Sequence, residues 1–122
     1  MDKDIKKTAL RMIPYGLYVL TGEGKDGKIA AATVNWVTQT AFEPPLVVVG
    51  VKADSGAHAI IKESRTFALN ILGKDQKNQA YTFFKTLERE GDTIGGEPFR
   101  KGSLGAPILQ NAPAFVECQL VE

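Results

Sequence analysis

The sequence is short of the residues that build metal centres, disulfide frameworks and nucleophilic sites. Its 122 residues include one cysteine, Cys118, and one histidine, His58. One cysteine forms no internal disulfide, so nothing indicates an oxidising compartment and we expect a cytoplasmic protein. Zinc and iron–sulfur sites need several such ligands, so we expect no metal site. Cys118 lies in an alternating strand pattern, far along the sequence from His58, which favours a buried structural thiol. We therefore expect no catalytic side chain.

Charge of one sign and long apolar runs are also missing. Lys and Arg number 15 against 14 Asp and Glu, and a net charge of +1 gives no basic surplus for nucleic acid. No apolar stretch approaches the roughly 20 residues of a membrane span, and the N-terminal MDKDIKKTAL has no apolar signal region. We therefore expect neither nucleic acid nor a membrane as a partner, and a single globular domain.

The phosphate-binding motifs with glycine-rich loops are incomplete or absent. Residues 22–28, GEGKDGK, nearly match the P-loop pattern, but Ile29 stands where the motif needs Ser or Thr. A strand pattern follows where the motif needs a helix, so we interpret this stretch as a hairpin turn built on Asp26-Gly27. No G-x-G-x-x-G opens a helix after a strand, which excludes a Rossmann dinucleotide site.

The spacing of apolar residues predicts many short strands and few helices. Helices are expected at residues 4–12, 55–64 and 75–86. Strands are expected at 15–21, 29–38, 46–51, 67–72 and 115–121, with an irregular stretch at 91–111. Asp75 is expected to cap the third helix, with Tyr81, Phe83 and Phe84 partly inward. The continuous apolar run at 46–51 predicts a strand buried on both faces. Because strands and helices do not alternate regularly, the pattern favours a small β-barrel with two or three short helices outside it.

Polar side chains interrupt the second predicted strand and its continuation. The residues concerned are Thr33, Val34, Asn35, Trp36 and Val37, followed by Gln39 and Thr40. A buried polar group without a partner costs ~1–3 kcal/mol, and a ligand rich in donors and acceptors would satisfy several of them. A flat heterocycle with carbonyl and imide edges fits such a lining. Trp36 would stack against that ring, or is instead a core residue.

The stretch from Lys52 to His58 crosses from a strand end to a helix start. The free N–H groups of the first helical turn, at Gly56, Ala57 and His58, favour an anion. Lys52 would add a full charge, Ser55 a hydroxyl and His58 a further donor, which suits a phosphate. The alternative, equally open on this segment alone, is an ordinary Asp or Ser cap with an exposed histidine.

An ordered series of segments resembles one known family. The segment ATVNWVTQT at 32–40, followed by Pro-Pro-Leu-Val at 44–47, resembles the flavin reductase-like family with an FMN-binding split barrel. The resemblance continues at 52–61, 67–72, 105–109 and 114–118. It implies a mainly β fold, an antiparallel, Greek-key-like split β-barrel with peripheral helices. It also implies FMN held at the interface of a homodimer.

The resemblance assigns the candidate site residues. Thr33, Asn35, Trp36 and Val37, with Val34 among them, match the segment along the flavin ring and ribityl chain, and Gln39 and Thr40 match positions beside the ring. Lys52, Ser55, Ala57 and His58 match the loop around the phosphate. Many relatives carry Thr where this chain has Ala57, and Ser55 is the hydroxyl that would substitute. Relatives continue into a Gly-Asp-His segment that is missing here, so we expect residues 1–122 to form one domain without the usual C-terminal strands.

The activity that the resemblance implies needs no acid–base pair, because hydride transfer uses the electronics of the flavin. We expect an oxidoreductase that takes hydride from NADH or NADPH as cosubstrate. It would pass the electrons to a small-molecule acceptor, namely free flavin, a metal complex or oxygen. Three alternatives remain open. They are an FMN-carrying electron-transfer protein without nicotinamide activity, a barrel that binds haem or another non-flavin heterocycle, and a barrel without a ligand.

Overall fold

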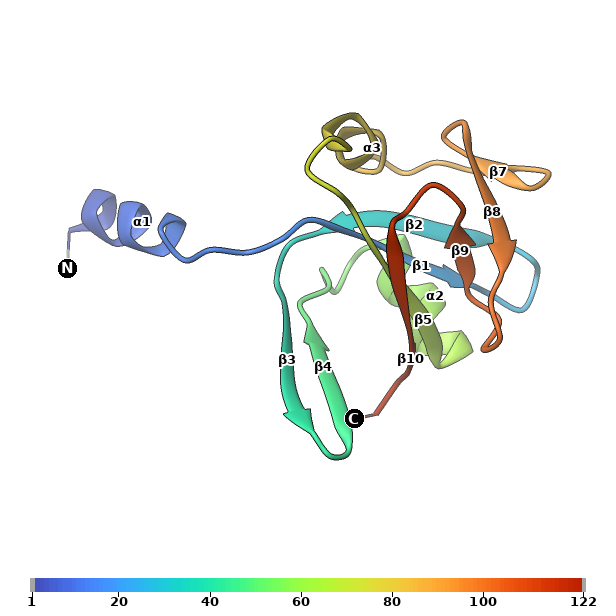
Figure 1. The fold of residues 1–122 in the computed structure, drawn as a ribbon, viewed down its shortest axis with the longest axis horizontal. Coiled ribbons are helices and arrows are strands. Elements are labelled where there is room, and N and C mark those ends of the chain that lie inside the picture. The colour runs from blue at the N-terminus through green and yellow to red at the C-terminus, as the bar shows by residue number, and fades with distance from the viewer. Residues whose placement is uncertain (1, 122) are drawn as a thin grey trace.

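Short antiparallel strands dominate the structure, a computed structural model in which residues 2–121 are described (Figure 1). The helices are α1 (Lys3–Arg11), α2 (Gly56–Ser64) and α3 (Lys77–Thr82). The strands are β1 (Tyr18–Glu23), β2 (Ile29–Val34), β3 (Val37–Phe42), β4 (Pro45–Val49), β5 (Thr66–Ile71), β6 (Arg89–Glu90), β7 (Thr93–Ile94), β8 (Glu97–Lys101), β9 (Pro107–Leu109) and β10 (Ala114–Gln119). The expectation of a mainly β chain with three short helices is confirmed.

The central sheet has the strand order β10-β5-β1-β2, and every neighbouring pair is antiparallel. β1 and β2 form the predicted hairpin, with Glu23 opposite Ile29 and Gly27 at a φ of 81° in the turn. A positive φ costs glycine little, which is why Asp-Gly suits this turn. The interpretation of residues 22–28 as a hairpin turn rather than a P-loop is therefore confirmed.

Each face of the central sheet carries its own apolar cluster, because successive side chains of a strand point to opposite faces. The first cluster lies under α2 and contains Leu20, Ala57, Ile61, Phe67 and Leu69. The second lies under α3 and the small sheet and contains Val19, Ile29, Ala31, Phe83, Ile94, Phe99 and Leu109. α2 thus covers one face, and the small sheet of β6 to β9 covers the other.

A buried polar network joins β1, β5 and β9. The side chain of Asn70 is fully buried, and its Nδ2 donates to Val19 O at 2.9 Å and to Thr21 Oγ1 at 3.0 Å. Its Oδ1 accepts from Leu109 N at 2.8 Å, while Thr21 Oγ1 donates to Pro107 O at 2.6 Å. Every polar atom of the pair is satisfied, so the network fixes β9 against the central sheet.

The stretch at 91–111 is not irregular, and that expectation was wrong. It contributes to a four-stranded antiparallel sheet in the order β6-β7-β8-β9. Its strands are two to five residues long and are separated by glycines such as Gly95 and Gly96, both at positive φ. Strands this short show too little alternation to be recognised. Glu23 anchors this sheet to the β1–β2 hairpin through Arg89 at 3.5 Å and Lys101 at 3.3 Å.

The predicted strand at 29–38 breaks at Asn35 and Trp36 into β2 and β3. β3 then pairs with β4 in a separate two-stranded hairpin that projects from the body (Figure 1). Gly50 N donates to Trp36 O at 2.8 Å, which closes the root of this hairpin. The expectation that 46–51 is buried on both faces was wrong, because Leu46 and Val48 are exposed. An apolar run indicates that a strand favours burial, but it does not show that other parts of the same chain cover that strand.

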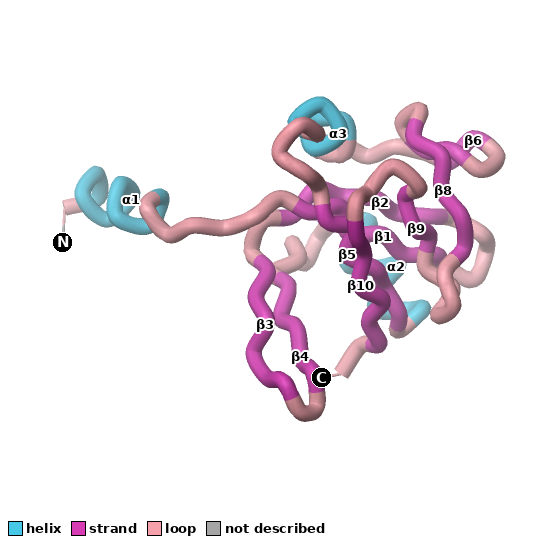
Figure 2. The backbone as a smooth tube through the Cα atoms, viewed as in Figure 1, coloured by secondary structure: helices cyan, strands magenta, loops and turns pink. Residues whose placement is uncertain are grey.

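α1 forms as expected, and Asp2 caps it by accepting from Asp4 N at 2.7 Å and Ile5 N at 3.3 Å. The helix lies at the end of an extended arm, away from the sheets (Figure 2), and none of its residues is buried. No helix among residues 2–121 combines the length and apolar character that a membrane crossing requires.

α3 differs from its prediction in both cap and length. It begins at Lys77 after Gln76, no side chain caps it, and it ends at Thr82. Asp75 is therefore not the cap. Of the three aromatic residues expected to point partly inward, only Phe83 is buried, while Tyr81 and Phe84 are exposed. The backbone bends after Thr82, so the helical spacing used for the prediction no longer applies there.

Candidate functional site

The N-terminus of α2 offers backbone donors to an anion. Ser55 is the N-cap, and its Oγ accepts from His58 N at 3.1 Å and donates to Lys52 O at 2.7 Å. The first-turn N–H groups of a helix have no partner inside that helix and carry partial positive charge. A side-chain carbon added at Gly56 would meet no heavy atom within 4 Å. An anion therefore has both donors and space at this position.

The four residues predicted around a phosphate all lie at this helix start, but they contribute differently. Ala57 is buried with its side chain in the cluster under α2, so only its backbone is available. His58 is half-buried. Lys52 is mostly exposed and lies 3.8 Å from Asp54 Oδ1, so solvent and that carboxylate weaken its charge. The hydroxyl of Ser55 already donates to Lys52 O and accepts from His58 N, as described above.

The end of β2 and the break between β2 and β3 supply the second part of the candidate site. Thr33 Oγ1 donates to Ala80 O at 2.5 Å and Thr33 N donates to Phe83 O at 3.0 Å, so this threonine is tied to α3. Asn35 is half-buried at the break between β2 and β3, where Trp36 is 72% exposed. The alternative that Trp36 is a core residue is wrong.

Two of the candidate segments meet in the fold. Val34 and Val37 pack against the cluster under α2, to which Ala57 also belongs. The chain break after β2 and the start of α2 therefore share one apolar wall. Gln39 and Thr40 lie further along β3, both exposed, and Gln39 Nε2 donates to Ala41 O at 3.2 Å. These two residues are not brought to the helix start within the single chain.

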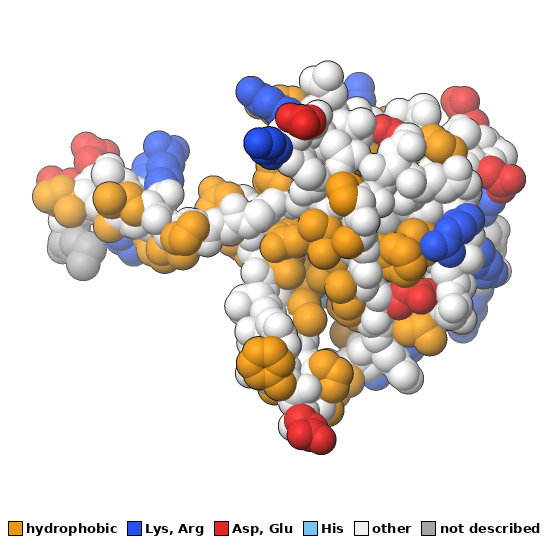
Figure 3. All heavy atoms as spheres, in the orientation of Figure 1, with side chains coloured by type: hydrophobic (Ala, Val, Ile, Leu, Met, Phe, Trp, Pro, Cys, Tyr) orange, Lys and Arg blue, Asp and Glu red, His pale blue; other side chains and the backbone are white. Residues whose placement is uncertain are grey.

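Large apolar side chains surround this region at the surface. Figure 3 shows them between the β3–β4 hairpin and the central sheet, at the hairpin tip and along the arm. The exposed members on these elements include Ile5, Leu10, Met12, Ile13, Trp36, Phe42, Leu46 and Val48. Phe42 is 86% exposed. Large apolar side chains that gather at an exposed surface are typical of an interaction site.

Comparison with known proteins assigns the chain to a family. A family model described as a flavin reductase like domain matches residues 10–122. The chain belongs to the flavin reductase-like family. It is 33% identical over 122 residues to diflavin flavoprotein A 1 of a Synechocystis species, covering 98% of this chain and 21% of that protein. It is 30% identical over 126 residues to the reductase component of a 4-nitrophenol monooxygenase of Rhodococcus opacus, covering 100% of this chain and 63% of that protein.

A solved structure gives the same assignment for the fold. The flavin reductase of styrene monooxygenase from Pseudomonas putida S12 superposes with a TM-score of 0.79 at 30% identity, over 95% of this chain and 72% of that one. The expected split-barrel fold is thereby confirmed. This flavin reductase-like domain spans about a fifth of the length of the diflavin flavoproteins that it matches.

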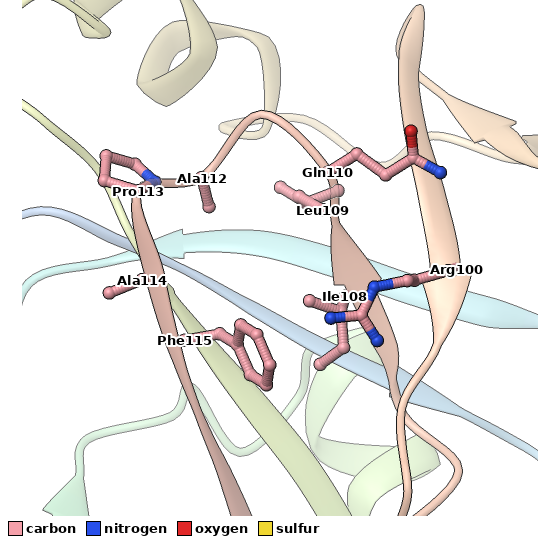
Figure 4. Close-up of a pocket in the computed structure, with 8 residues that line it drawn as sticks. All are labelled: Arg100, Ile108, Leu109, Gln110, Ala112, Pro113, Ala114 and Phe115. Carbon is pink, nitrogen blue, oxygen red and sulfur yellow. The ribbon is translucent and has the colours of Figure 1, made fainter.

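The flavin reductase-like domain also carries two open cavities that the sequence did not predict. The β10 cavity, of about 510 Å³, lies between β8, β9 and β10, where Arg100 extends toward Phe115 (Figure 4). The α3 cavity, of about 540 Å³, is lined by Leu17, Lys74, Lys77, Ala80, Tyr81 and Phe84. Neither cavity is lined by a predicted site residue, but Ala80 of the α3 cavity is bonded to Thr33.

Cys118 is half-buried in β10 and packs against the cluster under α2. Burial raises the pKa of its thiol above the ordinary value, because the charged thiolate is poorly solvated there. Cys118 therefore stays a protonated thiol at neutral pH, which agrees with the structural role expected of it.

Proposed function

We propose that this domain binds FMN and takes hydride from NADH or NADPH, passing electrons to free flavin, a metal complex or oxygen. The observation that carries the proposal is the open start of α2 beside the break between β2 and β3. Donors and empty space for a phosphate lie there next to an apolar wall suited to a flat ring. Two of the relatives described above are named as flavin reductases or reductase components of monooxygenases, which supports the proposal.

The residues of this chain fit the parts of FMN. The backbone N–H groups of Gly56 and Ala57 would hold the phosphate, with Lys52 and His58 adding charge and a further donor. Val34 and Val37 would form the apolar wall that excludes water from the ring. When bound, FMN would supply the two-electron chemistry, and the protein would supply position, dryness and the backbone donors of the helix start. Thr33 would act by holding β2 against α3.

An electron carrier that holds FMN without reacting with nicotinamide is the second candidate. One observation favours it, the 33% identity to a protein named as a diflavin flavoprotein rather than as a reductase. A cytoplasmic location stays a prediction.

The first test is the colour of the purified protein and its response to NADH. We expect absorption in the visible flavin bands after loading with FMN, and loss of those bands when NADH is added without air. Chemical reduction by dithionite is the control that the bound flavin is accessible to electrons. Bleaching by dithionite but not by NADH or NADPH would favour the carrier. Failure to bind FMN at all would contradict both functions.

We also propose that the domain acts as a homodimer with FMN at its interface. Support comes from the apolar side chains that are exposed on α1 and on the β3–β4 hairpin. The hairpin also carries Gln39 and Thr40, which lie in β3. A second copy covering the hairpin would bring further surface to the ring side of the site.

The oligomeric state can be tested at the hairpin. Phe42→Asp places a charge on the most exposed large side chain of β3, so we expect the mass measured by light scattering to fall toward that of one chain, with FMN occupancy falling in parallel. Leu104→Lys adds a charge to an exposed apolar residue between β8 and β9 and is expected to leave both unchanged. A wild-type protein that is monomeric and fully loaded would contradict the interface site.

A further inference from the structure

We propose that the β10 cavity binds a small organic acid, namely a carboxylate carried on a flat apolar body. This site is separate from the candidate flavin site, and it does not depend on the proposed function. The argument comes from one arginine with unused donors, from the apolar walls around that arginine and from the place of the cavity in the fold.

Arg100 is the charged residue that lines the β10 cavity. Its side chain extends from β8 toward Phe115 of β10, and its guanidinium carbon lies 5.2 Å from the centroid of that ring (Figure 4). Within residues 2–121, the guanidinium makes no ion pair and donates no hydrogen bond. A guanidinium that lies over a ring keeps its N–H donors at its own edge. The donors of Arg100 are therefore available to a ligand.

Arg89 provides a comparison within the same small sheet. Its guanidinium carbon lies 5.1 Å from the ring centroid of Phe99, so it also forms a cation–π contact. Its donors, however, are engaged by the carboxylates of Glu23 and Asp92 and by two backbone carbonyls. Arg89 is thus satisfied by its own chain. Arg100 has the same kind of ring contact without these partners, which indicates that it can still bind an anion.

The acidic side chains on the flanking strands do not neutralise Arg100. Glu97 of β8 accepts a hydrogen bond from Asn111 Nδ2 at 2.9 Å, and Glu117 of β10 accepts one from Leu104 N at 3.0 Å. In the described part of the chain, neither carboxylate lies within ion-pair distance of Arg100. The cavity therefore presents a positive charge, which favours an anionic ligand.

The walls of the cavity decide what the anion is attached to. Ile108 and Leu109 line it from β9 and are buried, Pro113 and Ala114 line it at the start of β10, and Phe115 is 39% exposed. A volume of about 510 Å³ lies in the range of small-molecule sites. An inorganic anion would leave these apolar groups in contact with water, whereas a flat apolar body would cover them.

The single cation favours a carboxylate over a phosphate. One guanidinium matches the two oxygens of a carboxylate with two parallel hydrogen bonds. One positive charge also balances the single negative charge of a carboxylate, whereas a phosphate monoester carries a larger charge at neutral pH. The combination of a guanidinium fork and an apolar wall therefore fits an aryl carboxylate, for which benzoate is the simplest probe.

The central sheet separates this cavity from the candidate flavin site. Cys118 of β10 packs against the cluster under α2, and Phe115 lies three positions earlier, so it projects from the opposite face of the strand. Val34 of the candidate flavin site packs against that same cluster under α2. The wall of the cavity is also fixed, because Leu109 N donates to the buried Asn70 Oδ1 at 2.8 Å. Both sites can therefore be occupied at once.

The first test titrates the full chain with benzoate at constant ionic strength and follows binding by NMR. We expect saturable binding with a Kd of about 1 mM or lower, which a ligand of this size can reach. The signal of the Arg100 side-chain Nε–H should shift during the titration. Benzamide has the same ring without the charge, and acetate has the charge without the ring, so each should bind at least about tenfold more weakly. Equal affinity for benzoate and benzamide, or no saturable benzoate binding, would overturn the proposal.

Variants assign the binding to the cavity. Arg100→Gln is expected to weaken benzoate about tenfold or more, and Arg100→Lys severalfold, since lysine keeps the charge but not the planar fork. Phe115→Leu keeps an apolar side chain without the ring and should also weaken benzoate severalfold. Arg11→Gln removes the same charge from the exposed α1 and serves as the matched control, with no change expected. Thermal melting checks that each variant folds. Wild-type affinity in both Arg100 variants, or an equal loss in Arg11→Gln, would show that the cavity is not the site.

A further titration separates this inference from the proposed function. We expect benzoate to bind equally well with and without saturating FMN, and Arg100→Gln to leave FMN affinity unchanged. Displacement of benzoate by FMN would mean that the two ligands share one site, and the proposal would be wrong. A protein that binds benzoate through Arg100 but never binds FMN would refute the proposed function while sustaining the carboxylate site.

Discussion

Replacing Asn70 by leucine is expected to lower the free energy of unfolding by about 3 to 5 kcal/mol, which is a large part of the stability of an ordinary domain. Asn70 is fully buried and satisfies Val19 O, Thr21 Oγ1 and Leu109 N at once. Leucine has a similar volume but no polar atom, so all three groups would lose a partner without access to water. Guanidinium unfolding followed by circular dichroism measures the change.

Asn111→Leu provides the matched control for this variant. Asn111 is exposed, and its Nδ2 donates to the exposed Glu97 Oε2 at 2.9 Å, so we expect a loss of less than about 1 kcal/mol. Thr21→Val should cost less than Asn70→Leu, and the two together should cost less than their sum, because they break the same network. Additive effects, or a small loss for Asn70→Leu, would show that the network does not hold β9 to the sheet.

Gly56→Asp is expected to weaken FMN about 100-fold, or roughly 3 kcal/mol, while leaving the fold as stable as before. An added side chain meets nothing within 4 Å at this position, and a carboxylate in the first turn of a helix is favourable by about 0.3–1 kcal/mol. The same carboxylate would repel the phosphate of FMN. Flavin fluorescence titration measures the affinity, and thermal melting measures the stability.

Riboflavin, which lacks the phosphate, makes this experiment specific. Its affinity should be equal in wild type and Gly56→Asp if the helix start holds the phosphate. Ser103→Asp adds the same charge at an exposed turn between β8 and β9 and is expected to have no effect on either ligand. Equal FMN affinity in wild type and Gly56→Asp would place the phosphate elsewhere. A parallel loss of riboflavin would indicate damage to the ring site instead.

The elements that the sequence predicted well depend on neighbouring residues. The β1–β2 hairpin follows from Asp26-Gly27, and α2 begins where Ser55 offers a cap, because both signals act within a few residues. The strand position of β10 follows from local alternation, and that of β5 from a short, mainly apolar run. Both segments of the candidate site could be proposed from the sequence for the same reason, since their polar residues are consecutive in the chain.

The features that the sequence did not reveal depend on distant partners. The exposure of β4 could not be predicted, because its apolar residues look the same whether their own chain or another covers them. The internal bond of Thr33 needs Ala80, 47 residues away. The α3 cavity combines Leu17 with residues near 72–84, and no sequence pattern within either segment predicts it. Topology alone brings such residues together.

The arm that carries α1 has an energetic consequence. A helix of nine residues with no buried side chain gains nothing from tertiary packing, and isolated helices shorter than about 12 residues are marginal in water. We therefore expect its backbone amides to exchange their protons almost as fast as those of a free peptide while the helix has no packing partner. Whatever docks onto the arm must first supply the free energy that orders it, which lowers the affinity of that contact and makes it readily reversible.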